Sequence, residues 1–337
     1  MHRRNGTTAG AAAIGGLLWL ASLAGAGTWH SSRAAAQTAY PTKPVRLVVP
    51  FPPGGGADIV ARLLAPFLQR TFGQSFYVEN RAGAAGRVGT GVVAQSAADG
   101  YTLLIATESS IVIAPHMGVT MSYDPLKDLA PIAQLTRNTV MLAVHPDQPV
   151  RTLKDYIALA RANPGQVLYA SSGVGGPNHL AGEIFKQKTG LDIVHVPFQG
   201  TGAALQAVIA NQVGSMWGFT SGLLPYIAGN ALQAIAVGSL QRSPSLPDVP
   251  TVIEGGVPDY EATSWIGLLA PAGIDRKLIP ELSSAVRAGL QTREIADILL
   301  RDGSEIVAST ATSFIRVIVE DYAKYAKLAG LFKQIRQ

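Results

Sequence analysis

Short runs of β-branched and aliphatic residues alternate along the chain with segments whose apolar positions recur at helical spacing. The run Val45–Val49 is typical of a buried strand, and the apolar positions between 59 and 68 are typical of a helix. The same order of strand, loop and helix returns from residue 167 and again from residue 193. Because strand, helix and strand follow one another within few residues, we predict an α/β fold with parallel strands.

Strands are predicted at 45–49, 76–79, 101–106, 132–135, 140–144, 167–170, 193–196, 213–219, 234–237 and 265–270. Helices are predicted from 59, at 88–97 and 153–162, from 177, and at 203–210, 222–228, 276–290, 293–300 and 313–328. Gly73 and Thr152 are expected to cap helices, and Pro66 to kink the first helix or end its first part. Arg137 and Asn138 are expected to separate two strands.

The chain is expected to pass twice between two domains. We interpret the strand-like segment 131–144 as a crossover into the second domain, and 265–270 as the return. Two crossings predict a discontinuous domain, 40–137 with 265–337, and an inserted domain, 138–264. Each would be a mainly parallel sheet flanked by helices, and a hinge would let the pair close over a ligand.

Three predicted strand-to-helix junctions, 54–58, 172–178 and 199–204, are rich in glycine and small hydroxyl residues. In the first, the N–H groups of residues 54–57 stand at a helix N-terminus with no partner inside the helix, which makes an anion site from backbone. The loop is not G-x-G-x-x-G and lacks the Lys and Ser/Thr of a P-loop, so a small carboxylate fits better than a nucleotide. The three junctions could grip both ends of a di- or tricarboxylate, one end from each domain.

Asp58 would repel an anion, and we favour its carboxylate as a cap for the helix over direct ligand contact. No arginine lies inside the three junctions, so the site would recognise carboxylate shape without a fixed countercharge. Phe51, Phe198 and Phe219 are candidates to line the pocket, and the alternative for each is ordinary core packing.

The first 36 residues are predicted to be a secretory signal peptide, because a basic start precedes a short apolar run and small-residue cleavage sites. The sites Ala24–Ala26 and Ala34–Ala36 compete, and we favour cleavage after Ala36. Cleavage removes three arginines and no acid, so the net charge falls from +5 to +2. Nothing basic remains in clusters, which argues against nucleic-acid binding. The chain has no cysteine, which excludes disulfides, a thiol nucleophile and a lipid-modified N-terminal cysteine.

Catalysis finds little support in the sequence. Ser171, Ser172 and Ser221 are available, but no G-x-S-x-G elbow surrounds them. His179 and His195 are interpreted as structural groups or ligand-side donors, and no His, Asp or Glu set has metal-ligand spacing. We therefore expect no metal and no cofactor.

Three carboxylates near predicted strand ends, Asp58, Glu79 and Glu108, could form a cluster. Helix capping and solvation explain each of them equally well, so they add no catalytic argument.

Motifs spread in order over the mature chain carry a family resemblance: Tyr40–Gly55, Val78–Arg81, Asp99–Leu103, His179-Leu180, His195–Pro197 and Leu246–Thr251. On these residues the chain resembles the Bug receptors, the periplasmic solute-binding proteins of tripartite tricarboxylate transporters. The resemblance implies a two-domain Venus-flytrap fold that binds a small carboxylate, often through backbone amides and bridging waters. It also implies a periplasmic monomer that delivers its ligand to an inner-membrane permease without catalysis.

Carried over by position, the resemblance implies a first-domain ligand loop, a second-domain loop and a third loop. The predicted ligand-binding residues are Phe51, Pro53, Gly54, Gly55, Gly56, Ala57, Asp58, Ser171, Ser172, Gly175, Gly176, His179, Phe198, Gly200, Thr201 and Phe219. Members often have Tyr-Lys-Gly where this chain has Phe198-Gln199-Gly200, and Asp where it has Gly214. Both departures make a less polar or aromatic carboxylate conceivable.

Two alternatives remain at this point. A receptor of the same fold could pass its ligand state to a membrane kinase, which a neighbouring kinase or permease gene would distinguish. A secreted serine hydrolase using Ser171 or Ser172 would turn over simple esters and lose that activity when either serine is replaced.

Overall fold

The computed structural model describes residues 40–330 and 332, so the predicted signal peptide lies outside the described residues. The strands are β1 (Val45–Val49), β2 (Phe76–Asn80), β3 (Thr102–Thr107), β4 (Leu129–Val144), β5 (Val167–Ser171), β6 (Ile193–Pro197), β7 (Ser215–Phe219), β8 (Gln233–Val237), β9 (Thr263–Pro271) and β10 (Glu305–Ile306). The α-helices are α1 (Gly56–Phe72), α2 (Arg87–Ala94), α3 (Leu153–Ala162), α4 (Pro177–Thr189), α5 (Thr201–Ile209), α6 (Thr220–Ala228), α7 (Leu278–Leu290), α8 (Arg293–Arg301) and α9 (Ala311–Lys327). Shorter turns are η1 (Ala84–Gly86) and η3 (Ala114–His116), which are 3₁₀, and η2 (Ser109–Ile113), which is π-helical.

The described strands form one sheet in the order β2-β1-β3-β9-β4-β7-β5-β6, with β8 and β10 also paired to β4. Strand β1 is parallel to β2 and β3, and β5 is parallel to β6 and β7. Strands β4 and β9 run antiparallel to β7 and β3 and to each other. We call β1–β3 the first half of the sheet and β5–β7 the second half.

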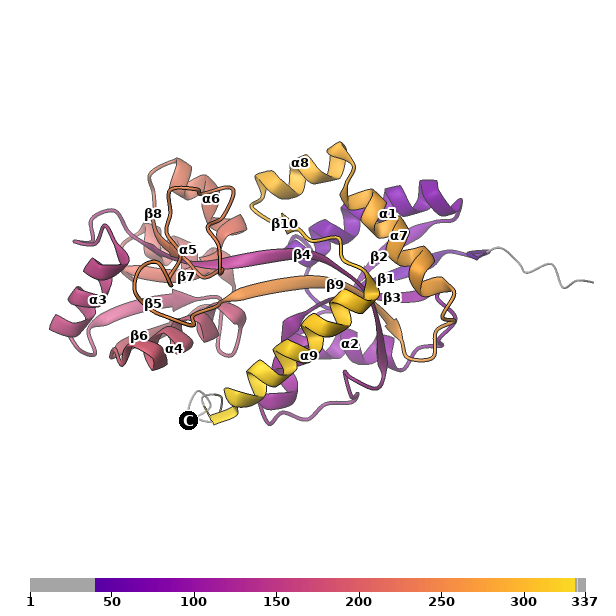
Figure 1. Cartoon of the computed structure of the whole chain (residues 1–337), viewed down its shortest axis with the longest axis horizontal. Coiled ribbons are helices and arrows are strands. Elements are labelled where there is room, and N and C mark those ends of the chain that lie inside the picture. The colour runs from indigo at the N-terminus through magenta and orange to yellow at the C-terminus, as the bar shows by residue number, and fades with distance from the viewer. Residues whose placement is uncertain (1–39, 331, 333–337) are drawn as a thin grey trace, which may run out of the picture. The chain divides into compact units, whose positions relative to one another are not determined.

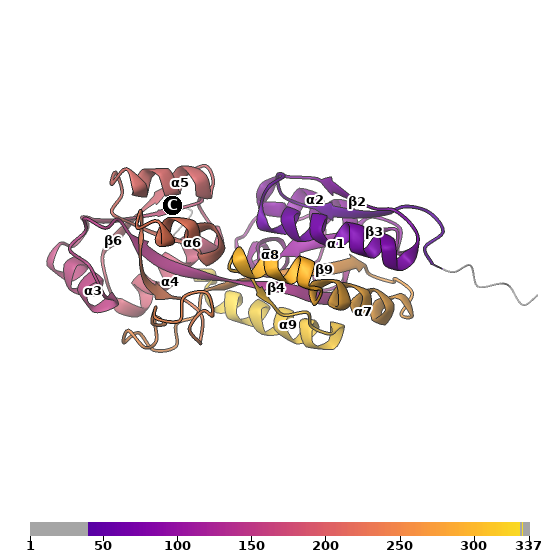
Figure 2. The ribbon, with the colours of Figure 1, turned by 90° about the horizontal axis from the view of Figure 1, so that it is seen from above.

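Strands β4 and β9 pair with each other and join the two halves (Figure 1, Figure 2). Strand β4 is continuous, so the predicted break at Arg137 and Asn138 is wrong. These residues stay in the strand because they pair with Trp265 and Ser264 of β9. The predicted domain boundaries, after 137 and before 265, fall inside these two strands, and the division into two domains stays a prediction.

Both faces of the sheet are covered by helices. In the second half, Val140 and Leu142 of β4 pack with α3 and α4, while Met141 and Ala143 pack with α5 and α6. In the first half, α1, α7 and α8 share one core, and α9 packs with α2 and η2 in another. Burial on both faces explains why these strands read as continuous apolar runs rather than as alternating ones.

Local signals account for the helix ends. Gly73 has φ +71° and donates its N–H to the Gln69 carbonyl, as predicted for a C-cap. Thr152 caps α3 through a capping box with Asp155. Helix α1 runs through Pro66 to Phe72, so Pro66 does not end its first part, and the alternative expectation of a kink stays a prediction. Pro66 has no N–H to donate to the carbonyl of Arg62, which is an exposed residue.

Candidate functional site

The loop between β1 and α1 presents backbone at the N-terminus of a 17-residue helix. Gly54 has φ +87°, a conformation that favours glycine, and Gly55 is an extended N-cap with no side-chain cap. Gly54, Gly55 and Gly56 are all exposed. The first amide groups of a helix have no acceptor within it, and they carry the positive end of its dipole, so this loop can receive a negatively charged group.

Asp58 shapes this loop from within. Its Oδ2 accepts from the Gly54 N–H and from Arg62 Nε, both at 2.9 Å, and its Oδ1 accepts from Asn80 Nδ2 at 2.9 Å. Burial alone would raise the pKa of Asp58, but the bonds from Arg62, Gly54 and Asn80 outweigh it and lower the pKa. The predicted capping role is confirmed, and ligand contact by Asp58 stays a prediction.

The loop between β5 and α4 is organised by two stacked histidines. The rings of His179 on α4 and His195 on β6 lie 3.7 Å apart between centroids. His195 Nε2 shares a 2.6 Å hydrogen bond with Ser171 Oγ, and the Gly175 N–H donates to His179 Nδ1 at 3.0 Å. Of the predicted ligand residues, Ser171 is fully buried and His179 is 4% exposed, so both act here as supports of the loop backbone.

The pKa of both histidines is lowered to about 4, chiefly by burial. The Lys186 charge contributes at both, and the neighbouring His179 contributes at His195. A group whose pKa is depressed on folding binds fewer protons in the native state, so we expect stability to be lost as pH falls from about 6.5 to about 4. The loss should reach up to roughly 3 kcal/mol per histidine. Chemical denaturation of His195→Gln should show a shallower acid slope than the parent. His145→Gln, in the turn after β4, is the control, and equal slopes in all three proteins would contradict this role.

The second and third predicted loops are tied together by backbone. Phe198 N–H donates to the Ser171 carbonyl and Gly200 N–H to the Ser172 carbonyl, both at 3.1 Å. Gly200 has φ +98° and is the N-cap of α5, which begins at Thr201. The structure thus brings these two predicted loops side by side at the carboxyl ends of β5 and β6.

The three phenylalanines are all partly buried against cores. Phe51 packs on the first-half core, where a Cβ on Gly86 would lie 3.1 Å from its Cζ. Phe198 packs with α5 and α6, and Phe219 with α3 and α4. Core packing is therefore part of the role of each, and lining of a ligand pocket stays a prediction.

The remaining predicted residues differ in exposure. Pro53 is exposed and Ala57 is buried. Intermediate exposure is found for Ser172, Gly175, Gly176, Gly200 and Thr201.

Asn138 lies beside the β1–α1 loop, although the sequence indicates it only as a break between strands. A Cβ on Gly56 would be 3.8 Å from Asn138 Nδ2. No local sequence signal identifies it, because only the pairing of β4 with β9 places it there.

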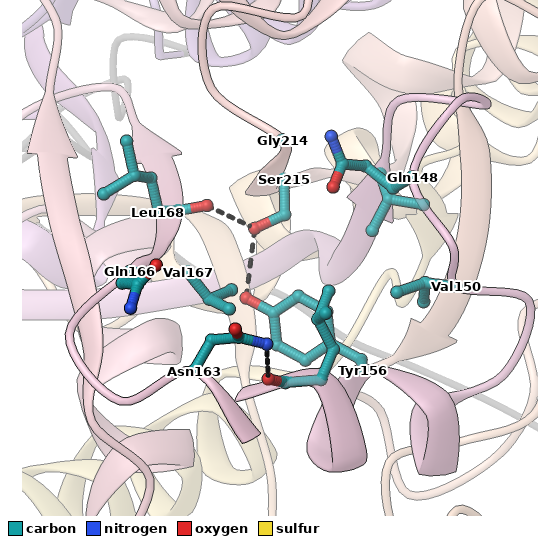
Figure 3. Close-up of a pocket in the computed structure, with 11 residues that line it drawn as sticks. Gln148, Val150, Tyr156, Asn163, Gln166, Val167, Leu168, Gly214 and Ser215 are labelled. Carbon is teal, nitrogen blue, oxygen red and sulfur yellow. Dashed lines mark hydrogen bonds between the residues drawn. The ribbon is translucent and has the colours of Figure 1, made fainter. Parts of the chain in front are cut away.

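A cavity of about 310 Å³ lies at the other end of β5 and β7 (Figure 3). Tyr156 and Ser215 point toward one another in it and share a 3.0 Å hydrogen bond, and Ser215 Oγ donates to the Leu168 carbonyl at 2.8 Å. None of the predicted ligand residues lines this cavity. Because these hydroxyls are satisfied within the protein, they do not call for a ligand.

Within residues 40–330 and 332, no group of three or more His, Asp or Glu side chains is arranged to hold a metal ion. In the same part of the chain, none of the helices combines the length and the hydropathy that crossing a membrane requires.

The sheet order and its loops define an α/β periplasmic binding protein. BugD, a periplasmic binding protein, has 30% identity and a TM-score of 0.75 over 88% of this chain and 98% of its own. Rpa4515 of R. palustris, solved with adipate, has 34% identity and a TM-score of 0.78 over 86% of this chain and 98% of its own. MatC (Rpa3494) from Rhodopseudomonas palustris, with bound malate, has 28% identity and a TM-score of 0.76 over 86% and 100%.

The model of the tripartite tricarboxylate transporter family receptor, TctC, matches residues 60–331. The protein BugT of Bordetella pertussis is 34% identical over 288 residues, which cover 85% of this chain and 88% of BugT. The chain belongs to the TctC family of periplasmic solute-binding receptors. The predicted family and fold are confirmed, and because these receptors are not enzymes, the serine hydrolase alternative falls away.

Proposed function

We propose that this receptor captures a small carboxylate with backbone amides of its glycine-rich loops and delivers it to an inner-membrane permease of the tripartite tricarboxylate type. The observation that carries the proposal is the exposed N-terminus of α1 at Gly54–Gly56. Its N-cap residue Gly55 has no side-chain cap, and the Asp58 carboxylate takes the Gly54 N–H. A carboxylate there would accept charge-assisted hydrogen bonds of roughly 1.5–3 kcal/mol each.

The chemistry of relatives supports the carboxylate. Rpa4515 was solved with adipate and MatC with malate, both dicarboxylates, and both share more than a quarter of their residues with this chain. The β5–α4 and β6–α5 loops, fixed to one another through Ser171 and Ser172, would hold the other end of such a ligand. The mature receptor would act as a periplasmic monomer after removal of residues 1–36.

Native mass spectrometry of the receptor extracted from its own periplasm tests this proposal. We expect a bound mono-, di- or tricarboxylate that is released on denaturation, and calorimetry with that compound should give saturable binding. A co-purifying ligand without a carboxylate, or binding that does not change when the α1 loop is altered, would contradict it. Deleting a neighbouring permease gene should abolish uptake of the same compound.

A further inference from the structure

Three side-chain oxygens without a hydrogen-bond partner among residues 40–330 and 332 lie on the two strands that flank β9: Thr107 Oγ1 on β3, and Thr136 Oγ1 and Asn138 Oδ1 on β4. Strand register aligns them, because Thr107 and Thr136 both pair with Ile266 of β9, from its two sides. Thr136 is fully buried and Asn138 is 8% exposed. Buried polar atoms normally find partners, so the unpartnered oxygens of Thr136 and Asn138, two positions apart on one face of β4, indicate a polar group that comes from outside the chain.

Asn138 and Ile266 lie next to the N-terminus of α1. A Cβ on Gly56 would be 3.6 Å from Ile266 Cδ1 and 3.8 Å from Asn138 Nδ2. The Asn138 amide therefore stands next to the first backbone N–H groups of the helix. Its two ends differ in chemistry, since the nitrogen donates two hydrogen bonds and the oxygen accepts two.

The charges around this place favour a neutral partner for the Asn138 oxygen. Asp58, which bonds Gly54, already has both oxygens engaged. Glu108 reaches Ser264, the register partner of Asn138, and its Oε2 accepts from Ser264 Oγ and the Trp265 N–H, both at 2.7 Å. Burial raises the pKa of Glu108 to about 8, so it is neutral near pH 7. Neither acid offers a free negative charge to an ammonium group, whereas a hydroxyl needs none.

We propose that Asn138 determines specificity: its amide nitrogen donates to the carboxylate held at the N-terminus of α1, and its oxygen accepts from a hydroxyl on the adjacent carbon of the ligand. The receptor would thus select hydroxycarboxylates over the corresponding unsubstituted acids. The inference rests on the proposed function and adds the ligand class. Binding a ligand without the hydroxyl leaves the Asn138 oxygen buried and unpaired, which should weaken binding about tenfold or more.

Matched ligand pairs test this inference by calorimetry on the mature receptor freed of bound ligand by unfolding and refolding. The pairs are lactate and propionate, malate and succinate, citrate and tricarballylate, and mandelate and phenylacetate. The variants are Asn138→Leu and Thr136→Val, which replace polar groups by apolar ones of similar size. Asn163→Leu is the control. Asn163 is the C-cap of α3, outside the predicted ligand loops, and its Nδ2 donates to the Leu159 carbonyl.

We expect the parent and Asn163→Leu to bind the hydroxylated member of a pair at least tenfold more tightly than its partner. Asn138→Leu should bring that ratio to within threefold, with a melting temperature no lower than that of the parent, and Thr136→Val should reduce the ratio. An equal affinity for both members in the parent, or a preference that survives in Asn138→Leu, overturns the inference and leaves the proposed function standing. Failure of the parent to bind any hydroxylated member of the four pairs also overturns the inference, whereas the proposed function is overturned only when the ligand that co-purifies with the receptor carries no carboxylate.

Discussion

Replacing Gly55 by tyrosine should abolish carboxylate binding while leaving the fold intact. The fold tolerates the change because Gly55 has an ordinary extended conformation, and a Cβ there meets only the Pro52 carbonyl oxygen, at 3.9 Å. The bulky side chain would cover the amide groups of α1. Losing two charge-assisted bonds costs roughly 3–6 kcal/mol, so calorimetry should show affinity reduced at least a hundredfold.

Gly330→Tyr is the matched control for this substitution, because Gly330 is exposed and a Cβ there meets nothing within 4 Å. Its affinity should equal that of the parent. Thermal unfolding should give similar midpoints for all three proteins. Affinity retained in Gly55→Tyr would show that the α1 loop is not the site, whatever the ligand is.

Glu108 should make the receptor less stable as the pH rises. Its pKa is raised from 4.5 to about 8, chiefly by burial, so between these values the native state holds a proton that the unfolded chain has released. The contribution of Glu108 to the free energy of unfolding should therefore fall from about pH 4.5 to about pH 8 and level off above. The full shift corresponds to roughly 5 kcal/mol as an upper limit. Urea denaturation at pH 5, 7 and 9 measures the slope.

Glu108→Gln should flatten this slope, since an amide keeps an acceptor for Ser264 and Trp265 but has no proton to release. Part of the slope should remain, because burial also raises the pKa of Asp321, which accepts from Trp265 Nε1. Glu305→Gln, at exposed Glu305, is the control and should keep the parental slope. Identical slopes for Glu108→Gln and the parent would show that Glu108 is charged in the native state. Because the histidines act in the opposite direction below pH 6.5, we expect greatest stability near pH 6.

Much of the fold could be predicted because local sequence patterns, such as apolar runs and helix-capping residues, indicate its strands and helices. The strand Val45–Val49 is recognisable from four β-branched and aliphatic residues interrupted only by Arg46, and helix 153–162 from Thr152 at its N-cap. The continuity of β4 could not be predicted, since Arg137 and Asn138 look like a turn unless their partners on β9 are known. Likewise no periodicity indicates the π-helical turn Ser109–Ile113.

The candidate site divides in the same way. The exposed glycines 54–56 and the capping role of Asp58 follow from neighbours in sequence. The stacking of His179 on His195, and the burial of Ser171 against them, depend on β6 lying next to β5. The sequence leaves the two histidines as structural groups or ligand-side donors, and the structure shows them supporting the loop. Ligand contact by Ser171 and His179, which the family resemblance implies, stays a prediction.

The backbone bonds between the β5–α4 and β6–α5 loops have a consequence for how ligand preference can change. The backbone N–H groups of Phe198 and Gly200 donate to the carbonyls of Ser171 and Ser172. Moving one loop alone would therefore break these hydrogen bonds. Substitutions in the two loops should therefore be energetically coupled rather than additive, so that a new preference arises through paired changes more readily than through single ones.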